Sequence, residues 1–287
     1  MAINLSKVNF TYNTPKKNKP LKNTLKDIDL EIASQDELIT IVGGSGAGKS
    51  TLVQLFNGLL LPSLGEMVVF DKKITNDKKI KLKDVRKKVG LVFQFPEYQL
   101  FEETILRDVA FGPTNFGLEN PIELAKEALS VVGIDSTLYE TNPFNLSGGQ
   151  KRRVAIAGIL ASNPDILVFD EPTVGLDPEG KKELLKLLKT LNEEHHKTII
   201  LITHDMDIVG EISKRVLVLK QGEIVFDGNK NTLFSNDELL RESSLDYPNT
   251  IKVLKEIKRK FNNDEINEYQ YTTEDVYSEL VRVFGDE

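Results

Sequence analysis

Short apolar runs alternate with amphipathic stretches along much of the chain. Residues 38–42, 166–169 and 198–203 are apolar and rich in β-branched side chains, as in strands buried on both faces. Residues 51–60 follow the first run with apolar side chains at helical spacing, and helical stretches precede the other two runs. Strands that alternate with helices predict an α/β protein built on a parallel sheet.

The first 32 residues show a different, alternating pattern. Residues 8–12 and 28–32 alternate apolar with polar side chains and predict two further strands. The segment between them, residues 13–26, is rich in Lys, Asn and Pro, which is typical of a solvated loop.

The middle of the chain is predicted to be helical. Residues 122–132 and 148–160 are amphipathic at helical spacing, and loops carrying Pro113, Gly117 and Pro143 are expected between the helices. We therefore expect a helical subdomain, about residues 95–163, inserted into the sheet domain.

Beyond Gly228 the sequence becomes charged and again favours helices. Apolar stripes at helical spacing fit either core or a partner surface, of which core is favoured. These stripes consist of Leu254, Ile257 and Phe261, and of Val276, Leu280, Val281 and Phe284.

Composition narrows the functional classes. The 287 residues are 40% hydrophobic, which suits a sizeable core, and the net charge of -7 with a pI near 5.3 argues against a nucleic-acid partner. No apolar run approaches the roughly 18 residues of a membrane span, and the first residues lack a signal peptide pattern, so we expect a cytosolic chain. The absence of Cys and of clustered His argues against a zinc site.

Residues 43–50 read Gly-Gly-Ser-Gly-Ala-Gly-Lys-Ser and match the pattern of a phosphate-binding loop between a strand and a helix. Lys49 is expected to reach the β- and γ-phosphates of a nucleotide, and the Ser50 hydroxyl to ligate Mg²⁺. The backbone amides around the phosphates are expected from Gly43, Gly44, Ser45, Gly46, Ala47, Gly48, Lys49, Ser50 and Thr51.

Polar residues follow three other predicted strands and are expected at the same sheet edge. Asp170 and Glu171 come after residues 166–169, and we expect Asp170 to hold Mg²⁺ and Glu171 to orient or deprotonate the attacking water. Gln94 follows residues 89–93 and could contact the metal or that water, although a strand-end glutamine is usually structural. His204 follows residues 198–203 and is a candidate γ-phosphate contact, with an ordinary structural role as the alternative.

Residues 146–150 read Leu-Ser-Gly-Gly-Gln and open a predicted helix, whose amino end is a second anion site. One γ-phosphate does not need two separate sites in one chain. We therefore expect this segment to act on ATP bound to another subunit, through Ser147, Gly148, Gly149 and Gln150.

Together with Gly175-Leu176-Asp177, these motifs occur in an order that resembles the nucleotide-binding subunits of ABC transporters over residues 1–230. The resemblance implies a P-loop NTPase of the ABC ATPase fold, with a parallel-sheet core, an antiparallel β subdomain, and ATP and Mg²⁺ as cofactors. It further implies that Tyr12 stacks on adenine and that Asp177 shapes the subunit interface. The implied catalytic residues are Glu171, His204, Gln94 and Lys49, and the implied metal ligands are Ser50, Gln94 and Asp170.

A narrower resemblance lies in residues 93–101, Phe-Gln-Phe-Pro-Glu-Tyr-Gln-Leu-Phe, and in residues 108–113 and 115–117. These segments are similar to the ATPase subunits of energy-coupling factor transporters, which import vitamins or transition-metal ions, and more so to the second of the two paralogues. The resemblance implies that residues 231–287 form a helical extension for dimerisation.

The partners implied by this group are a second ATPase subunit, paralogue or self, a transmembrane coupling subunit and a substrate-binding membrane subunit, with no nucleic acid. The implied location is the cytoplasmic side of the cell membrane. Phe95, Tyr98 and Phe101 either contact the membrane partner or fill the core of the helical subdomain. The alternatives are the ATPase of another ABC importer and a soluble ABC-type ATPase unconnected with transport.

Overall fold

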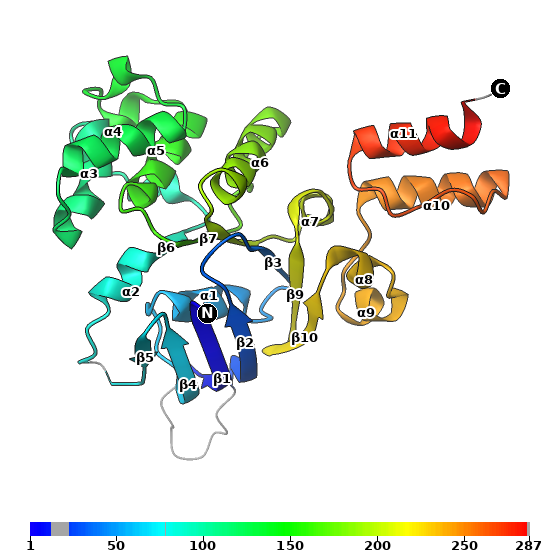
Figure 1. Ribbon diagram of the computed structural model, residues 1–287, viewed down its shortest axis with the longest axis horizontal. Helices are drawn as coiled ribbons and strands as arrows, with labels where there is room; N and C mark the ends of the chain where they lie inside the picture. The colour runs from blue at the N-terminus through cyan, green and yellow to red at the C-terminus, as the bar shows by residue number, and fades with distance from the viewer. Residues whose placement is uncertain (13–22, 78, 286–287) are drawn as a thin grey trace.

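The larger of two sheets forms the centre of the molecule (Figure 1). The computed structural model describes residues 1–12, 23–77 and 79–285. The larger sheet has six strands in the order β10-β9-β3-β8-β7-β6. All neighbours in it are parallel except β10 and β9, which confirms the predicted α/β fold. Its strands are β3 (Leu38–Val42), β6 (Val89–Val92), β7 (Ile166–Asp170), β8 (Thr198–Ile202), β9 (Arg215–Lys220) and β10 (Glu223–Gly228).

The second sheet has four antiparallel strands and matches the antiparallel β subdomain expected from the resemblance. Helices α1 (Lys49–Phe56) and α2 (Lys83–Lys88) contribute to the core between this sheet and one face of the larger one. The order is β2-β1-β4-β5, with β1 (Ile3–Phe10), β2 (Leu25–Ile32), β4 (Leu64–Val69) and β5 (Lys72–Ile74).

Alternating side chains of the central strand β7 face two different cores. Ile166 and Val168 of β7 face the core with α1, whereas Leu167 and Phe169 face a second core with the remaining helices. That second core packs helix α6 (Pro178–Glu193) and the helical subdomain against the sheet. The subdomain comprises α3 (Ile105–Phe116), α4 (Pro121–Val131), α5 (Gly148–Leu160) and the short turns η1 (Pro96–Gln99), η2 (Ser136–Leu138) and η3 (Pro143–Asn145).

One loop prediction was wrong, because Pro113 lies inside α3 rather than between helices. A proline within a helix removes a backbone hydrogen bond. Here Pro113 is buried on the same helix face as Val109 and Ala110, so tertiary packing of this face holds the helix together despite that loss. Gly117 ends α3 in a left-handed conformation, as a helix-terminating glycine does.

The C-terminal helices begin within the body of the protein and end outside it (Figure 1). Leu233, Phe234, Leu240 and Ile251 are buried against β9 and α7 (Met206–Ile212). The expectation that the later apolar stripes form core was wrong for Phe261 and Val281, which are exposed because α10 and α11 extend beyond the sheet. The helices are α8 (Lys230–Phe234), α9 (Asp237–Glu242), α10 (Asn249–Phe261) and α11 (Thr273–Phe284).

No helix among the described residues combines the length and the apolar character needed to cross a bilayer.

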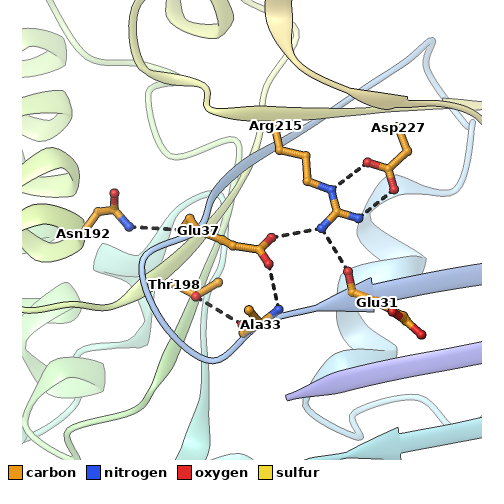
Figure 2. Close-up of polar contacts among 7 residues, drawn as sticks. All are labelled: Glu31, Ala33, Glu37, Asn192, Thr198, Arg215 and Asp227. Atoms are coloured by element: carbon orange, nitrogen blue, oxygen red, sulfur yellow. Dashed lines mark hydrogen bonds and ion pairs between the residues drawn. The ribbon is translucent and has the colours of Figure 1, made fainter. Parts of the chain in front are cut away.

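A polar junction ties the amino-terminal ends of the central strands to the smaller sheet (Figure 2). The Arg215 guanidinium donates to both carboxylate oxygens of Asp227 on β10, at 2.6 and 2.7 Å, and to Glu37 just before β3, at 3.0 Å. It also donates to the carbonyl oxygen of Glu31 on β2 at 3.0 Å. The hydrogen bond to Asp227 raises the pKa of Arg215, so its guanidinium stays charged.

We predict that Arg215→Lys lowers the free energy of unfolding by about 1–3 kcal/mol, because an ammonium cannot replace the guanidinium fork. Urea unfolding followed by circular dichroism measures this change. The control is Arg259→Lys, whose partner Glu256 lies on the exposed face of α10, and whose effect should stay within about 0.5 kcal/mol. Equal losses in both variants would contradict the importance of the junction.

Candidate functional site

The carboxyl ends of β3, β6, β7 and β8 meet at one edge of the larger sheet, where ligands bind in parallel α/β proteins. A cavity of about 490 Å³ opens there. The phosphate loop lines it together with Gln94, Asp170, Glu171 and His204. The fold thus brings together side chains as distant in the sequence as Thr24 and His204.

The loop after β3 is held in a shape that only glycine allows at its first position. Gly43 has φ +144°, and a Cβ atom there would lie 2.1 Å from the carbonyl oxygen of Leu219 on β9. Gly48 precedes α1 with φ +106°, so the helix begins directly behind the loop. Backbone amides and the positive end of the α1 dipole therefore face the cavity and favour an anion there.

Lys49 lies across the loop, and its ammonium donates to the carbonyl oxygens of Gly43 and Gly44 at 2.8 and 3.1 Å. Burial lowers the pKa of Lys49, while the charges of Glu171 and Asp170 oppose that shift. A half-buried ammonium so close to the loop is well placed to bind a phosphate chain.

Asp170, the last residue of β7, lies beside Ser50 at the start of α1. Burial raises the pKa of the Asp170 carboxyl, and a hydrogen bond from Ser50 and the charge of Lys49 act in the opposite direction. With Gln94, which lines the same cavity, these residues offer carboxylate, hydroxyl and amide oxygens, a donor set that suits a hard cation such as Mg²⁺. No group of three or more His, Cys, Asp or Glu side chains within the described ranges could hold a metal alone. Oxygens from a bound phosphate chain would complete this set.

Glu171 turns away from β7 in a left-handed conformation, φ +52°, and its amide donates to the carbonyl oxygen of Ile202 at 3.0 Å. Its carboxylate pairs with Nδ1 of His204 at 2.7 Å. Because an ionised carboxylate only accepts hydrogen bonds, Nδ1 is the donor in this pair and Nε2 remains available to a ligand. The two side chains form a carboxylate and imidazole pair at the rim of the cavity.

Tyr12 lies beside the cavity but is not part of its lining. Its hydroxyl is 3.0 Å from that of Thr51 on α1, and its ring packs edge-on against Phe10. Tyr12 is 60% exposed, which suits stacking on a planar base. Residues 13–22, most of the predicted solvated loop, lie outside the described residues.

The segment Leu-Ser-Gly-Gly-Gln does not reach this cavity. Ser147 caps α5: its side chain accepts from the Gln150 amide at 3.2 Å, and the Gln150 side chain accepts from the Ser147 amide at 3.0 Å. Ser147, Gly148, Gly149 and Gln150 line another cavity of about 580 Å³, together with Gly175 and Asp177. The linings of the two cavities share no residue, so one chain alone does not combine the two motifs.

Sequence reasoning missed Arg152 and Glu97, which connect the two regions. Arg152 is only 5% exposed and forms an ion pair with Glu97 of η1 at 3.0 Å. The signal in the sequence was an arginine four residues before Ile156, on the apolar face of a predicted helix, where an unpaired charge would be costly.

Comparisons with known proteins agree with this geometry. A family model described as ABC transporter matches residues 25–174. The energy-coupling factor transporter ATP-binding protein EcfA2 of Clostridium tetani is 44% identical over 268 residues, 92% of each chain.

Two solved structures extend the likeness to the fold. The structure of cbiO1 from Clostridium perfringens, part of the ABC transporter complex cbiONQ, superposes with a TM-score of 0.73 at 37% identity, covering 91% of this chain and 98% of that one. A dimeric ATP-binding cassette with ADP and phosphate, in a post-hydrolysis state, gives a TM-score of 0.66 at 31% identity, over 79% and 98% of the two chains.

The expected resemblance is therefore confirmed on both sequence and fold. The chain belongs to the ABC transporter family, as an ATP-binding and ATP-hydrolysing subunit of the energy-coupling factor group.

Proposed function

We propose that this chain hydrolyses ATP in a site shared by two ATPase subunits and thereby drives import of a vitamin or a transition-metal ion. The observation that carries the proposal is the separation of the phosphate loop and the Ser147 segment into two cavities of one chain. A second subunit would bring its Ser147 segment to the open side of the nucleotide. The dimeric cassette that resembles this chain supports such pairing.

Binding and hydrolysis of ATP would use different parts of the cavity. The loop amides and Lys49 would hold the β- and γ-phosphates, and Tyr12 would stack on the adenine. Glu171 would accept a hydrogen bond from water and direct its oxygen to the γ-phosphorus, while the bond from that phosphorus to the β,γ-bridging oxygen breaks. The products are ADP and phosphate, and the proton of the water leaves through Glu171. His204 would both hold Glu171 and contact the γ-phosphate.

Mg²⁺ is the cation that we assign to Ser50, Gln94 and Asp170. It would neutralise charge between the β- and γ-phosphates. The partly buried Asp170 carboxyl, whose pKa is raised, favours a cation that stabilises its ionised form. The hydrogen bond between Ser50 and Asp170 already brings two of the three ligands into contact.

Pairing depends on the terminal phosphate, which would bridge Lys49 of one subunit and Ser147 of its partner. The hydroxyl of Ser147 accepts from the Gln150 amide, so its own proton is free to bind an anion. Exposed Gly148 and Gly149 add backbone donors at the positive end of α5. Loss of the phosphate would remove this bridge, and the pair would relax.

A membrane partner would bind the aromatic patch, which we define as Phe95, Tyr98, Phe101 and Phe111. Tyr98 is 83% exposed and Phe101 57%, so these rings do not fill the subdomain core. The patch starts one residue after Gln94, which supports a mechanical connection between the nucleotide and the transmembrane coupling subunit. The chain would then lie against the cytoplasmic side of the cell membrane, with a substrate-binding membrane subunit in the same complex.

Residues 231–287 would extend the ATPase domain, residues 1–230, with a second pairing surface. Phe261 is 59% exposed at the end of α10, and its ring centroid lies 5.4 Å from that of Phe284 on α11. Val281 is exposed on α11. Apolar side chains at the projecting ends of two helices suit contact with a second ATPase subunit, identical or paralogous.

We expect Glu171→Gln to bind ATP with the affinity of the unchanged protein and to lower turnover by on the order of 100-fold or more, because the carboxylate serves the water. The variant should accumulate as an ATP-bound pair in gel filtration. The matched variant Lys49→Ala should instead lose ATP affinity in equilibrium binding. Unchanged phosphate release by Glu171→Gln would refute the role given to this residue.

Co-expression with the neighbouring membrane proteins should allow detergent extraction of a complex that contains this chain. Replacing Tyr98 and Phe101 by Ser should lower its recovery roughly tenfold, as for loss of a buried aromatic anchor. Leu64→Ser, at an exposed apolar position on β4, is the control and should leave recovery unchanged. Recovery of the chain with ribosomes or DNA instead would reject the transporter assignment.

The double variant Phe261→Ser, Val281→Ser should weaken pairing of ATPase subunits by roughly tenfold in dissociation constant, since exposed apolar contacts are lost. Sedimentation velocity in the presence of ATP measures this dissociation constant, and every protein compared carries Glu171→Gln so that ATP is not hydrolysed. Leu59→Ser, of similar exposure to Val281, serves as the control. Pairing of equal strength in all three proteins would eliminate the extension as an interface.

A further inference from the structure

The guanidinium of Arg152 joins two loops that follow two different strands. Its Nε and Nη2 donate to the two carboxylate oxygens of Glu97, at 3.2 and 3.0 Å. Its Nη1 donates to the carbonyl oxygens of Pro172 and Val174, at 2.8 and 3.1 Å. One planar group therefore binds η1, after β6, and the segment after β7.

The surroundings of Arg152 require all of these contacts. Its side chain is 6% exposed and that of Glu97 17%, so neither charge is well solvated. Removing one partner would leave the other as an unpaired charge in the interior. The fork pattern also needs the fixed geometry of a guanidinium, since a lysine ammonium is a single point charge.

Both loops carry residues of the proposed reaction. Glu97 stands three positions after Gln94, and Pro172 directly follows Glu171. The segment after Glu171 is itself a tight turn, in which the amide of Val174 donates to the carbonyl oxygen of Glu171 at 3.3 Å. Arg152 lies five residues into the segment that begins at Ser147, on the same helix α5. A single side chain thus connects the Gln94 loop, the Glu171 loop and the helix that faces the partner's nucleotide.

We infer that Arg152 is a positioning residue, which sets the distance between Gln94 and Glu171 and couples both to the position of Ser147. It lies outside the lining of the phosphate-loop cavity and, like Glu97, lines the second cavity together with Ser147. When the partner's ATP holds Ser147, the rigid α5 transmits that position through Arg152 to the loop of Glu171 in the same chain. The inference rests on the proposed function, since it assumes that Gln94 and Glu171 act on ATP.

The test compares Arg152→Lys, Glu97→Gln and the double variant in the paired ATPase. Arg152→Lys should lower kcat on the order of tenfold to a hundredfold, as for displacement of a catalytic group by about an ångström. The equilibrium Kd for ATP should stay within about twofold, because Lys49 and the loop keep their contacts. Glu97→Gln should lower kcat as well, and the double variant should be no worse than Arg152→Lys, because both changes break one network.

Arg215→Lys is the matched control, since that arginine also donates four hydrogen bonds to two carboxylates and a backbone oxygen, but at the opposite edge of the sheet. It should lower the Tm and keep kcat within about twofold at a temperature where all variants are folded. This comparison separates positioning from general loss of stability.

The inference is overturned if Arg152→Lys keeps the parent kcat, if the two single losses multiply in the double variant, or if Arg215→Lys loses kcat to the same degree. If Glu171→Gln instead keeps the turnover of the unchanged protein, the proposed function is overturned, whatever the Arg152 variants do.

Discussion

The contact between Gly43 and the carbonyl oxygen of Leu219 is the constraint on which the site depends. Parallel pairing of β3 with β9 brings the loop so close to that oxygen that no Cβ atom fits. The loop must then curl back over the start of α1, with its amides and Lys49 toward one point. The large buried sheet thus supplies a rigid support, and Ala47, which is buried in the core with α1, anchors the loop to it.

Charge at the same edge is arranged around that loop. Lys49, Asp170 and Glu171 line one partly buried cavity, where the charges of both carboxylates act on the pKa of Lys49 and the charge of Lys49 acts on the pKa of Asp170. Two carboxylates and one ammonium leave a negative excess, which suits a divalent cation brought in with a phosphate chain. The affinity for the nucleotide and the affinity for its metal are therefore expected to depend on each other.

The second constraint is the distance between the loop and the amino end of α5. The helical subdomain packs on the face of the sheet opposite to α1 and β1, so the amino end of α5 lines a separate cavity. In the proposed function, a chain built in this way would gain a complete site only in a pair. The buried contacts of Arg152 join this helix to the loops after β6 and β7, which gives the two regions a direct mechanical link.

Apolar periodicity and glycine patterns report local backbone conformation and burial directly. For that reason the buried strands, the loop from Gly43 to Ser50 and the polar residues at strand ends could be predicted from the sequence. Which distant groups meet could not be predicted in this way, because it depends on how the whole chain packs. The pairing of Glu171 with His204, the burial of Arg152 against Glu97, the helical conformation at Pro113 and the exposure of Phe261 each depend on neighbours remote in the chain. A local pattern states that a side chain is apolar or charged, but only the packed fold determines what covers it or pairs with it.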